Sequence, residues 1–191
     1  TLYEEKKYKE SLAMIAGELD ITKDMEVDSS NYNLRFLAAH NHWKLGNLQG
    51  AISHFKRCAD IKKDSADPLI DLSLMMLDNR RYGDANYFAT SALKIAESQM
   101  PYYVLGKSAM KLWNLYKAKE YFEKAISIDP EFWTAYNDLG IVLTGLKKYG
   151  EANTAFSAAL SIMPDSSEIQ NNIGISLEKM DKLEAVSYTH L

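Results

Sequence analysis

Residues 119–140 read KEYFEKAISIDPEFWTAYNDLG, and the same order of features returns in ALSIMPDSSEIQNNIG at residues 159–174. In both stretches an apolar segment ends in isoleucine, a proline follows two residues later, and a second apolar segment leads to a glycine. Proline lacks an amide hydrogen and disfavours helix in the residue before it, so it ends a helix at this place. Because Pro130 and Pro164 are 34 residues apart, we interpret the two stretches as the same junction in successive repeats.

One apolar helical face recurs with this period through most of the chain. One alanine recurs in each repeat, and we call the residues at one such repeat position a column. Four residues after each alanine stands a phenylalanine or alanine, seven residues after it a small residue, and ten residues after it an isoleucine. In chain order the columns are Ala51, Ala85, Ala118 and Ala152; Phe55, Ala89, Phe122 and Phe156; Cys58, Ala92, Ala125 and Ala159; and Ile61, Ile95, Ile128 and Ile162. Offsets of this kind fall on one side of an α-helix, so they predict one amphipathic helix in each unit.

A second helix is expected before each of these. Twelve residues ahead of the alanine column stands a small residue, preceded in most units by a larger apolar one. The small column is Ala39, Ser73, Gly106, Gly140 and Gly174. Small residues at matching places in two antiparallel helices let the backbones approach closely, while large apolar neighbours fill the space beside the contact. The pattern therefore predicts tandem helix–turn–helix units.

A helix–turn–helix unit of 34 residues with the pattern AYNDLG…Y…EA…F…A…I…P resembles the tetratricopeptide repeat. Residues 99–132 and 133–166 follow the pattern closely. Residues 66–98 follow it less closely, with Ser73 for glycine, Ala89 for phenylalanine and Glu97 for proline, and residues 32–65 are the most divergent. The resemblance implies an all-α fold, an α-solenoid of tandem helix-turn-helix repeats wound into a TPR-like right-handed superhelix.

The repeat pattern predicts the following division of the chain. It comprises a partial repeat with a linker at 1–31, four TPR-like repeats at 32–65, 66–98, 99–132 and 133–166, a truncated repeat at 167–184, and a tail at 185–191. The polar segment TKDMEVDSS at residues 22–30 is the expected linker, with a helix beginning near Ser30 or Asn31 as its N-cap. In the truncated repeat, we expect a first helix over Ser167 to Met180.

The last six residues, VSYTHL at 186–191, resemble the translation of a transposase mosaic end used in sequencing libraries. Val186 also stands where the alanine of the column should lie, so the repeat pattern fails at the same place. We therefore expect a tail of non-native origin, with a native tail as the open alternative.

Composition excludes several classes of function. The net charge of −4 is too small for a nucleic-acid footprint or an anionic-membrane anchor. The apolar runs are shorter than a membrane span, and the sequence carries no visible signal peptide. A single cysteine, Cys58, excludes an internal disulfide framework and fits a reducing compartment. We predict no nucleic-acid partner and no membrane partner.

Catalytic, cofactor and metal sites are not expected either. The sequence has no G-x-S-x-G, no P-loop and no G-x-G-x-x-G motif. His40 and His42 are two residues apart on different helix faces, and His54 stands alone in the sequence, so a shared metal is not expected. Cys58 is interpreted as a packing residue rather than a nucleophile, and the methionines Met75, Met76 and Met110 as core residues.

The resemblance also implies a function. In this family, the first helix of every repeat lines a concave groove that holds extended peptides or partner helices. The family's groove-lining positions correspond in this sequence to a candidate set of peptide-binding residues: Phe36, His40, Trp43, Ile70, Leu74, Tyr103, Lys107, Asn137, Ile141 and Asn171. We expect an apolar or amphipathic segment near the aromatic residues, with its backbone held by the asparagines, whose amides both donate and accept hydrogen bonds. Phe36, Trp43 and Leu74 have packing between units as an alternative role.

Members of the family that bind chaperone tails clamp a carboxylate with Lys, Asn and Arg. The corresponding positions here hold Phe36, His40, Asp71, Met100 and Asp138, so that specificity is not expected. The prediction is a non-enzymatic interaction scaffold for a protein or peptide partner. Two alternatives stay open: a regulatory or substrate-recruiting segment of a larger enzyme, and self-association through the exposed ends of the solenoid.

Overall fold

The computed structural model describes residues 2–21 and 30–189, and within them every regular element is an α-helix. The helices are α1 (Leu2–Ile21), α2 (Ser30–Lys44), α3 (Leu48–Ile61), α4 (Asp67–Asp78), α5 (Tyr82–Leu93), α6 (Gln99–Lys111), α7 (Leu115–Ile128), α8 (Trp133–Gly145), α9 (Tyr149–Ile162) and α10 (Ser167–Thr189). The chain forms two compact units, residues 1–97 and 98–191.

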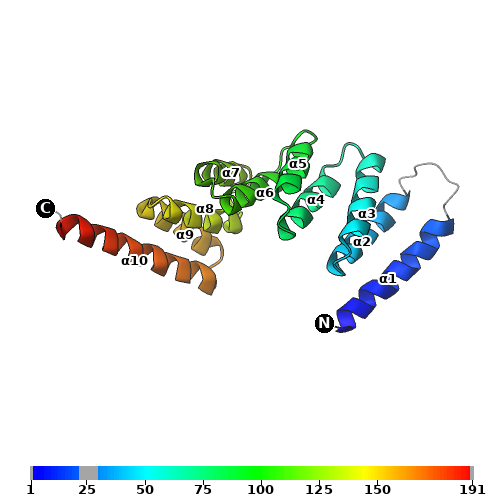
Figure 1. Cartoon of the computed structure of the whole chain (residues 1–191), viewed down its shortest axis with the longest axis horizontal. Coiled ribbons are helices and arrows are strands. Elements are labelled where there is room, and N and C mark those ends of the chain that lie inside the picture. Colours follow the sequence, from blue (N-terminus) through cyan, green and yellow to red (C-terminus); the bar gives the residue numbers. More distant parts are fainter. Residues whose placement is uncertain (1, 22–29, 190–191) are drawn as a thin grey trace. The chain divides into compact units, whose positions relative to one another are not determined.

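The first unit contains α1 to α5. Helices α2 and α3 form one hairpin and α4 and α5 the next, with α3 contacting α4 (Figure 1). Helix α1 packs on α2, where the Asn41 side-chain amide donates a hydrogen bond of 2.8 Å to the Ser11 hydroxyl. The side chain of Ile15 is buried at the same contact. Helix α1 thus covers α2 as the second helix of a preceding repeat would.

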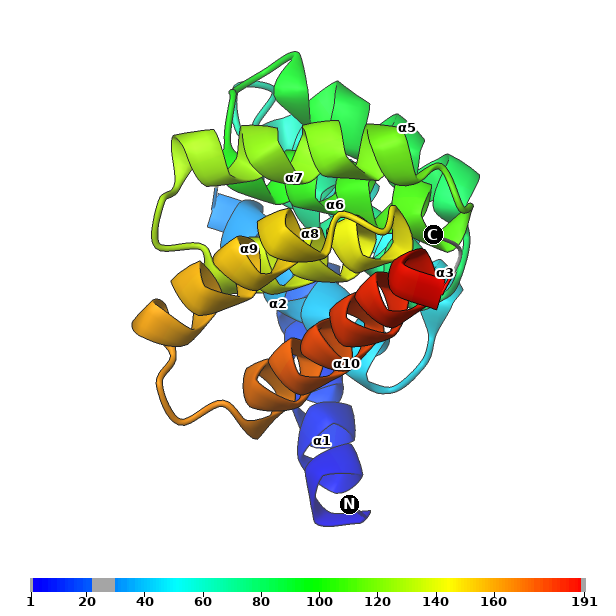
Figure 2. The ribbon, with the colours of Figure 1, turned by 90° about the vertical axis from the view of Figure 1, so that its left-hand side faces the viewer.

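The second unit contains α6 to α10. Figure 2 shows the hairpin of α6 and α7, the hairpin of α8 and α9, and α10 beside α9. One continuous apolar core runs through these helices, and the ring of Phe122 in α7 and that of Phe156 in α9 lie at its centre with almost no exposure. Each hairpin buries its apolar face on the next, which is how solenoids are stabilised.

The turns inside the hairpins share one backbone geometry. The residues Gly46, Arg80, Trp113 and Lys147 all have left-handed φ angles, between 59° and 72°. Each is the C′ residue of a Schellman motif: the Trp113 amide donates to the Met110 carbonyl at 3.1 Å, and the Asn114 amide to the Ala109 carbonyl at 2.9 Å. The motif ends the first helix of every hairpin at the same place.

The column of small residues on the first helices of the hairpins lies against the column of phenylalanines on the second helices. A Cβ atom added to Gly106 would come within 2.6 Å of the Phe122 ring, and one added to Gly140 within 2.5 Å of the Phe156 ring. In these two hairpins, the close approach of the paired helices therefore requires glycine opposite the phenylalanine ring. In residues 66–98, both positions of this contact differ from those of the later hairpins. Ser73, which carries a Cβ, replaces the glycine, and the small Ala89 replaces the phenylalanine ring.

The helix bounds can be set beside the predicted division of the chain, which stays a prediction. Each predicted repeat between residues 32 and 166 contains one hairpin, and α2 begins at Ser30. Helix α10, however, continues to Thr189, whereas the sequence led us to expect its end at Met180. Residues 178–186, EKMDKLEAV, contain strong helix formers and neither glycine nor proline, so nothing local ends the helix. Most of the expected linker, residues 22–29, lies outside the described residues.

Candidate functional site

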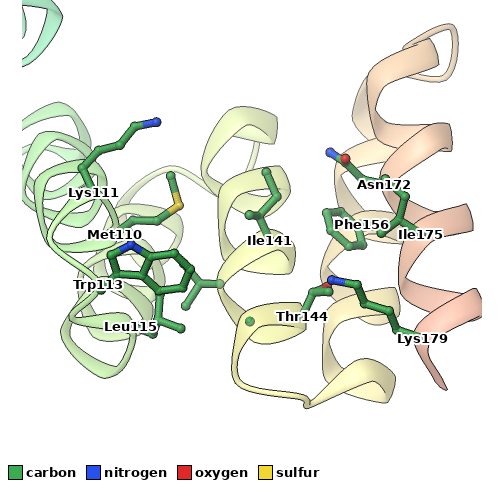
Figure 3. Close-up of a pocket in the computed structure, with 12 residues that line it drawn as sticks. Met110, Lys111, Trp113, Leu115, Ile141, Thr144, Phe156, Asn172, Ile175 and Lys179 are labelled. Carbon is green, nitrogen blue, oxygen red and sulfur yellow. The ribbon is translucent and has the colours of Figure 1, made fainter. Parts of the chain in front are cut away.

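A pocket of about 540 Å³ opens in the second unit, where the carboxyl-terminal parts of α6 and α8 face α10 (Figure 3). Its apolar lining comes from five helices, α6 to α10, and comprises Met110, Leu115, Ile141, Val142, Phe156 and Ile175. A pocket of this size and polarity accommodates one or two large apolar side chains. The helices lining it are mainly the first helices of their hairpins.

The rim of this pocket is polar and basic. Figure 3 shows Lys111 of α6 at one end of the lining, pointing away from Trp113 and Leu115, and Lys179 of α10 at the other end, pointing toward Thr144. Asn172 and Thr144 also contribute to the lining, which has no acidic member among the described residues. Within the described part of the chain, no carboxylate lies within 4.0 Å of either lysine nitrogen. The pocket therefore offers two positive charges to whatever occupies it.

Trp113 stands at the edge of the pocket in the turn between α6 and α7. Its side chain is 81% exposed, although its backbone has the left-handed conformation that favours glycine. Leu112 before it and Tyr116 in the first turn of α7 are also largely exposed. The turn thus presents apolar surface to solvent beside an apolar pocket.

A polar cluster joins α6 to α8 one helical turn from the pocket. The buried carboxylate of Asp138 accepts a hydrogen bond of 2.9 Å from the Tyr103 hydroxyl, and the Lys107 ammonium lies 2.9 Å from the same carboxylate. Burial, and then the neighbouring carboxylate, raise the pKa of the Tyr103 hydroxyl well above its usual range. Tyr103 therefore stays protonated as a donor, and both predicted residues Tyr103 and Lys107 have intramolecular partners.

Asn137 differs from its predicted role. The sequence placed its side chain on the groove surface, whereas the structure leaves it only 4% exposed. Its amide nitrogen donates to the Glu168 carboxylate at 3.2 Å, and its amide oxygen accepts from Asn172 at 3.0 Å. Asn137 therefore ties α8 to α10 and is not open to a peptide backbone. Of the other predicted residues in this unit, Asn171 is exposed, and Ile141 is 38% exposed and lines the pocket.

The candidate residues of the first unit form an aromatic row. On α2, the rings of Phe36 and His40 are 4.8 Å apart and those of His40 and Trp43 6.1 Å apart. Both Phe36 and His40 also contact the buried ring of Phe55 in α3. The His40 imidazole lies 3.1 Å from the Asp71 carboxylate of α4. These side chains are half-buried, so they pack within the unit and still present part of their surface.

Ile70 and Leu74 of α4 are half-buried as well. They belong to the helix that carries Asp71, so the structure brings all the first-unit candidates onto α2 and α4. The sequence could not show how much of each side chain neighbouring residues would cover.

The histidines and the cysteine have packing roles. The rings of His42 and His54 stack at 5.4 Å, so His54 is not isolated as its place in the sequence indicated, and burial lowers the pKa of both imidazoles. Cys58 is fully buried, as predicted, and burial raises the pKa of its thiol to about 11. Across residues 2–21 and 30–189, no cluster of three or more His, Cys, Asp or Glu side chains is placed to bind a metal.

Met75 and Met76 are buried core residues, as predicted, whereas Met110 is only partly covered and lines the pocket. None of the described helices is both long and apolar enough to span a membrane.

Sequence comparison identifies the repeat. Two models of the tetratricopeptide repeat match the chain, one at residues 100–132 and the other at residues 32–65. No curated protein matches the sequence.

Solved structures show the same fold at low sequence identity. A crystal structure of the MamA protein is 22% identical, covers 83% of this chain and 88% of that one, and has a TM-score of 0.69. YrrB, described as a TPR protein with an unusual peptide-binding site, is 18% identical with coverages of 85% and 83% and a TM-score of 0.66. The APC/C hetero-tetramer Cut9–Hcn1 is 16% identical, over 90% of this chain and 33% of that one, with a TM-score of 0.70.

The helix pairs and these folds define a helical-repeat protein, an all-α solenoid. More specifically, residues 32–65 and 100–132 match models of the tetratricopeptide repeat, so these two segments are similar to repeats of that family. Such repeats are the units of generally non-catalytic scaffolds for protein interaction.

Sequence reasoning missed Trp113 as a site residue. A signal for it was present, because Gly46, Arg80, Trp113 and Lys147 form another column with spacings of 34, 33 and 34 residues. In that column a tryptophan replaces residues that are small or charged. Lys179 was missed because the groove positions in α10 were carried over only as far as Ile175, although in earlier repeats they were followed one turn further, to residues such as Trp43.

Proposed function

We propose that this chain is a non-enzymatic interaction scaffold that binds a segment of a partner protein on the first-helix side of its repeats. The observation that carries the proposal is the apolar pocket of about 540 Å³ formed by α6, α8 and α10. YrrB, a structural relative, is described as having a peptide-binding site, which supports the same kind of ligand here.

Within the second unit, we propose that Ile141 contacts the bound segment inside the pocket. Asn171 lies in the first half of α10, is exposed, and carries an amide that can pair with a peptide backbone. Tyr103 and Lys107 are proposed to border the site, where their bonds to Asp138 fix their positions. Asn137 supports α10 from beneath and is no longer proposed as a contact.

In the first unit, the half-buried row on α2 and α4 is proposed as a second contact surface. It comprises Phe36, His40, Trp43, Ile70 and Leu74. Aromatic side chains supply large contact area at low entropic cost, which is why they are common among residues that dominate binding energy.

A peptide-display selection on the whole chain tests the proposal. The chain is immobilised, a random 12-residue library is selected, and dissociation constants of enriched peptides are measured by fluorescence polarisation. We expect Ile141→Gln to weaken binding about tenfold or more, since an apolar contact in the pocket is lost.

Leu177→Gln is the matched control. Leu177 lies on α10, is 41% exposed where Ile141 is 38% exposed, and does not line the pocket. It should leave the affinities unchanged, and circular dichroism should show both variants folded. Failure to enrich any peptide, or equal effects of the two substitutions, would contradict the proposed site.

A further inference from the structure

The side chains around the pocket indicate which class of ligand the proposed site binds. We infer that the pocket takes a large apolar side chain of a partner protein's segment with aspartate or glutamate on both flanks, and that Trp113 packs over this segment from the turn. The inference rests on the proposed function and specifies the partner class for the same pocket.

The first argument is charge complementarity. Lys111 and Lys179 line the pocket from α6 and α10 with no carboxylate partner among the described residues, whereas nearby Lys107 is already paired with Asp138. The chain as a whole has a net charge of −4, whereas the described lining of this pocket holds two lysines and no carboxylate. An acidic residue on each side of an apolar anchor would satisfy both ammonium groups.

The second argument is the conformation of Trp113. A left-handed backbone is costly for a bulky side chain and free of cost for glycine, which the equivalent turn uses at Gly46. At 81% exposure, the Trp113 side chain gains little from packing in the free protein to offset that cost. Figure 3 shows its indole ring beside Met110 and Leu115, two of the apolar lining residues. A bound segment would cover the indole and turn the exposed ring into a contact.

The occupant we commit to is an extended or helical segment of another protein rather than a second copy of this chain. A symmetric pair of chains joined through this face would set the lysine-lined pocket of one copy against the same pocket of the other, whose described lining holds no carboxylate. The ligand that fits must bring carboxylates of its own, spaced on either side of the apolar anchor.

Three pools of synthetic 12-residue peptides test the charge requirement. Each has one central Leu or Phe, with flanks of Asp and Glu in the first pool, Ser in the second, and Lys and Arg in the third. We expect the acidic pool to bind the whole chain about tenfold more tightly than the serine pool and the basic pool to bind most weakly, with the preference shrinking as salt is added.

The lysines are tested by charge removal. Lys111→Gln and Lys179→Gln should each reduce the preference for the acidic pool severalfold while leaving affinity for the serine pool unchanged. If all three pools bind equally, the inference fails and the proposed function stands. If no pool binds and peptide display also enriches nothing, the proposed function itself fails.

The tryptophan is tested by Trp113→Gly, with Lys147→Gly as the matched control in the corresponding turn of the next repeat, where φ is 61°. Both variants should raise the melting temperature, because both relieve a left-handed non-glycine residue. Only Trp113→Gly should weaken binding of the acidic pool, by about tenfold or more. Unchanged binding by Trp113→Gly, or sedimentation showing that Trp113 mediates dimers that exclude peptide, would overturn the inference.

Discussion

Lys147 stands at the left-handed position between α8 and α9, with a φ of 61° and an exposed side chain. Replacing it with glycine should raise the free energy of unfolding by about 1 kcal/mol, because glycine adopts this conformation without steric cost. Urea denaturation followed by circular dichroism measures the change.

Gly46 provides the reverse substitution. It has a φ of 72°, and a Cβ atom placed there would meet nothing within 4 Å, so Gly46→Ala isolates the backbone effect from packing. It should lower the free energy of unfolding by about 1 kcal/mol. Equal stabilities of the variants and the parent protein would show that these turns impose no conformational cost.

Cys58 predicts a pH dependence. Burial raises the pKa of its thiol from 9.0 to about 11, so the folded state retains a proton that the unfolded state loses. The stability from this group is therefore fully present below pH 9.0 and is lost as the pH rises through about 11. Comparing the parent chain with Cys58→Ala across this range removes the contribution of tyrosines and lysines.

The burial of Cys58 also predicts slow alkylation of its thiol in the folded protein. Native protein at pH 8 should react with iodoacetamide far more slowly than protein in urea, since the thiolate is the nucleophile and Cys58 has no exposed surface. Equal rates in the two states would contradict the buried position.

At the scale of the helix pair, the glycine and phenylalanine columns set how closely α8 approaches α9. Gly140→Ala should lower the free energy of unfolding by about 1–3 kcal/mol, because the new Cβ would lie 2.5 Å from the Phe156 ring and force the core to shift. Thermal and urea unfolding of the variant measure the loss.

Gly174 is the matched control for this substitution. It occupies the same column on α10, but a Cβ there would have no described atom within 4 Å. Gly174→Ala should instead raise the free energy of unfolding by up to about 1 kcal/mol through helix propensity alone. A loss of stability similar to that of Gly140→Ala would show that the clash is not the cause.

The columns explain why the fold could be predicted from the sequence. Residues such as Gly140 and Phe156 recur in register because the same contact is rebuilt in each hairpin, so the spacing reports the packing directly. The end of α10 at Thr189 could not be predicted in this way, since helix length there depends on local propensity and not on the column.

The candidate site was less predictable, because exposure depends on neighbours. Asn137 has a groove position in the repeat, yet Glu168 and Asn172 from the following helix cover it. Trp113 lies outside the positions that the family pattern marks, and only the φ angle of its turn shows that its presence has a cost.

At the scale of the whole molecule, the second unit has its own continuous core. Residues 98–191 expressed alone should show a helical circular dichroism spectrum and a cooperative thermal transition, because the facing partners of Phe122 and Phe156 lie within that range.

A shorter fragment serves as the control. Residues 98–148 lack α9 and α10, which leaves Leu139, Val142 and Leu143 of α8 without the helices that cover them. This fragment should be largely unfolded, since a repeat cannot bury its apolar face without its neighbour. Cooperative melting of the fragment 98–148, or none for 98–191, would contradict a core shared along the unit.

The Schellman turns have a consequence for how such a protein can change. Their hydrogen bonds join backbone atoms only, so the side chain at Arg80, Trp113 or Lys147 carries no part of the architecture. Each of these hairpins thus has one turn position at which the side chain can be replaced, and the free-energy cost of the left-handed backbone is nearly the same for different non-glycine residues. An engineer could place a fluorophore-bearing cysteine at Arg80, and natural variation could exchange ligand specificities there, with the framework left as it was.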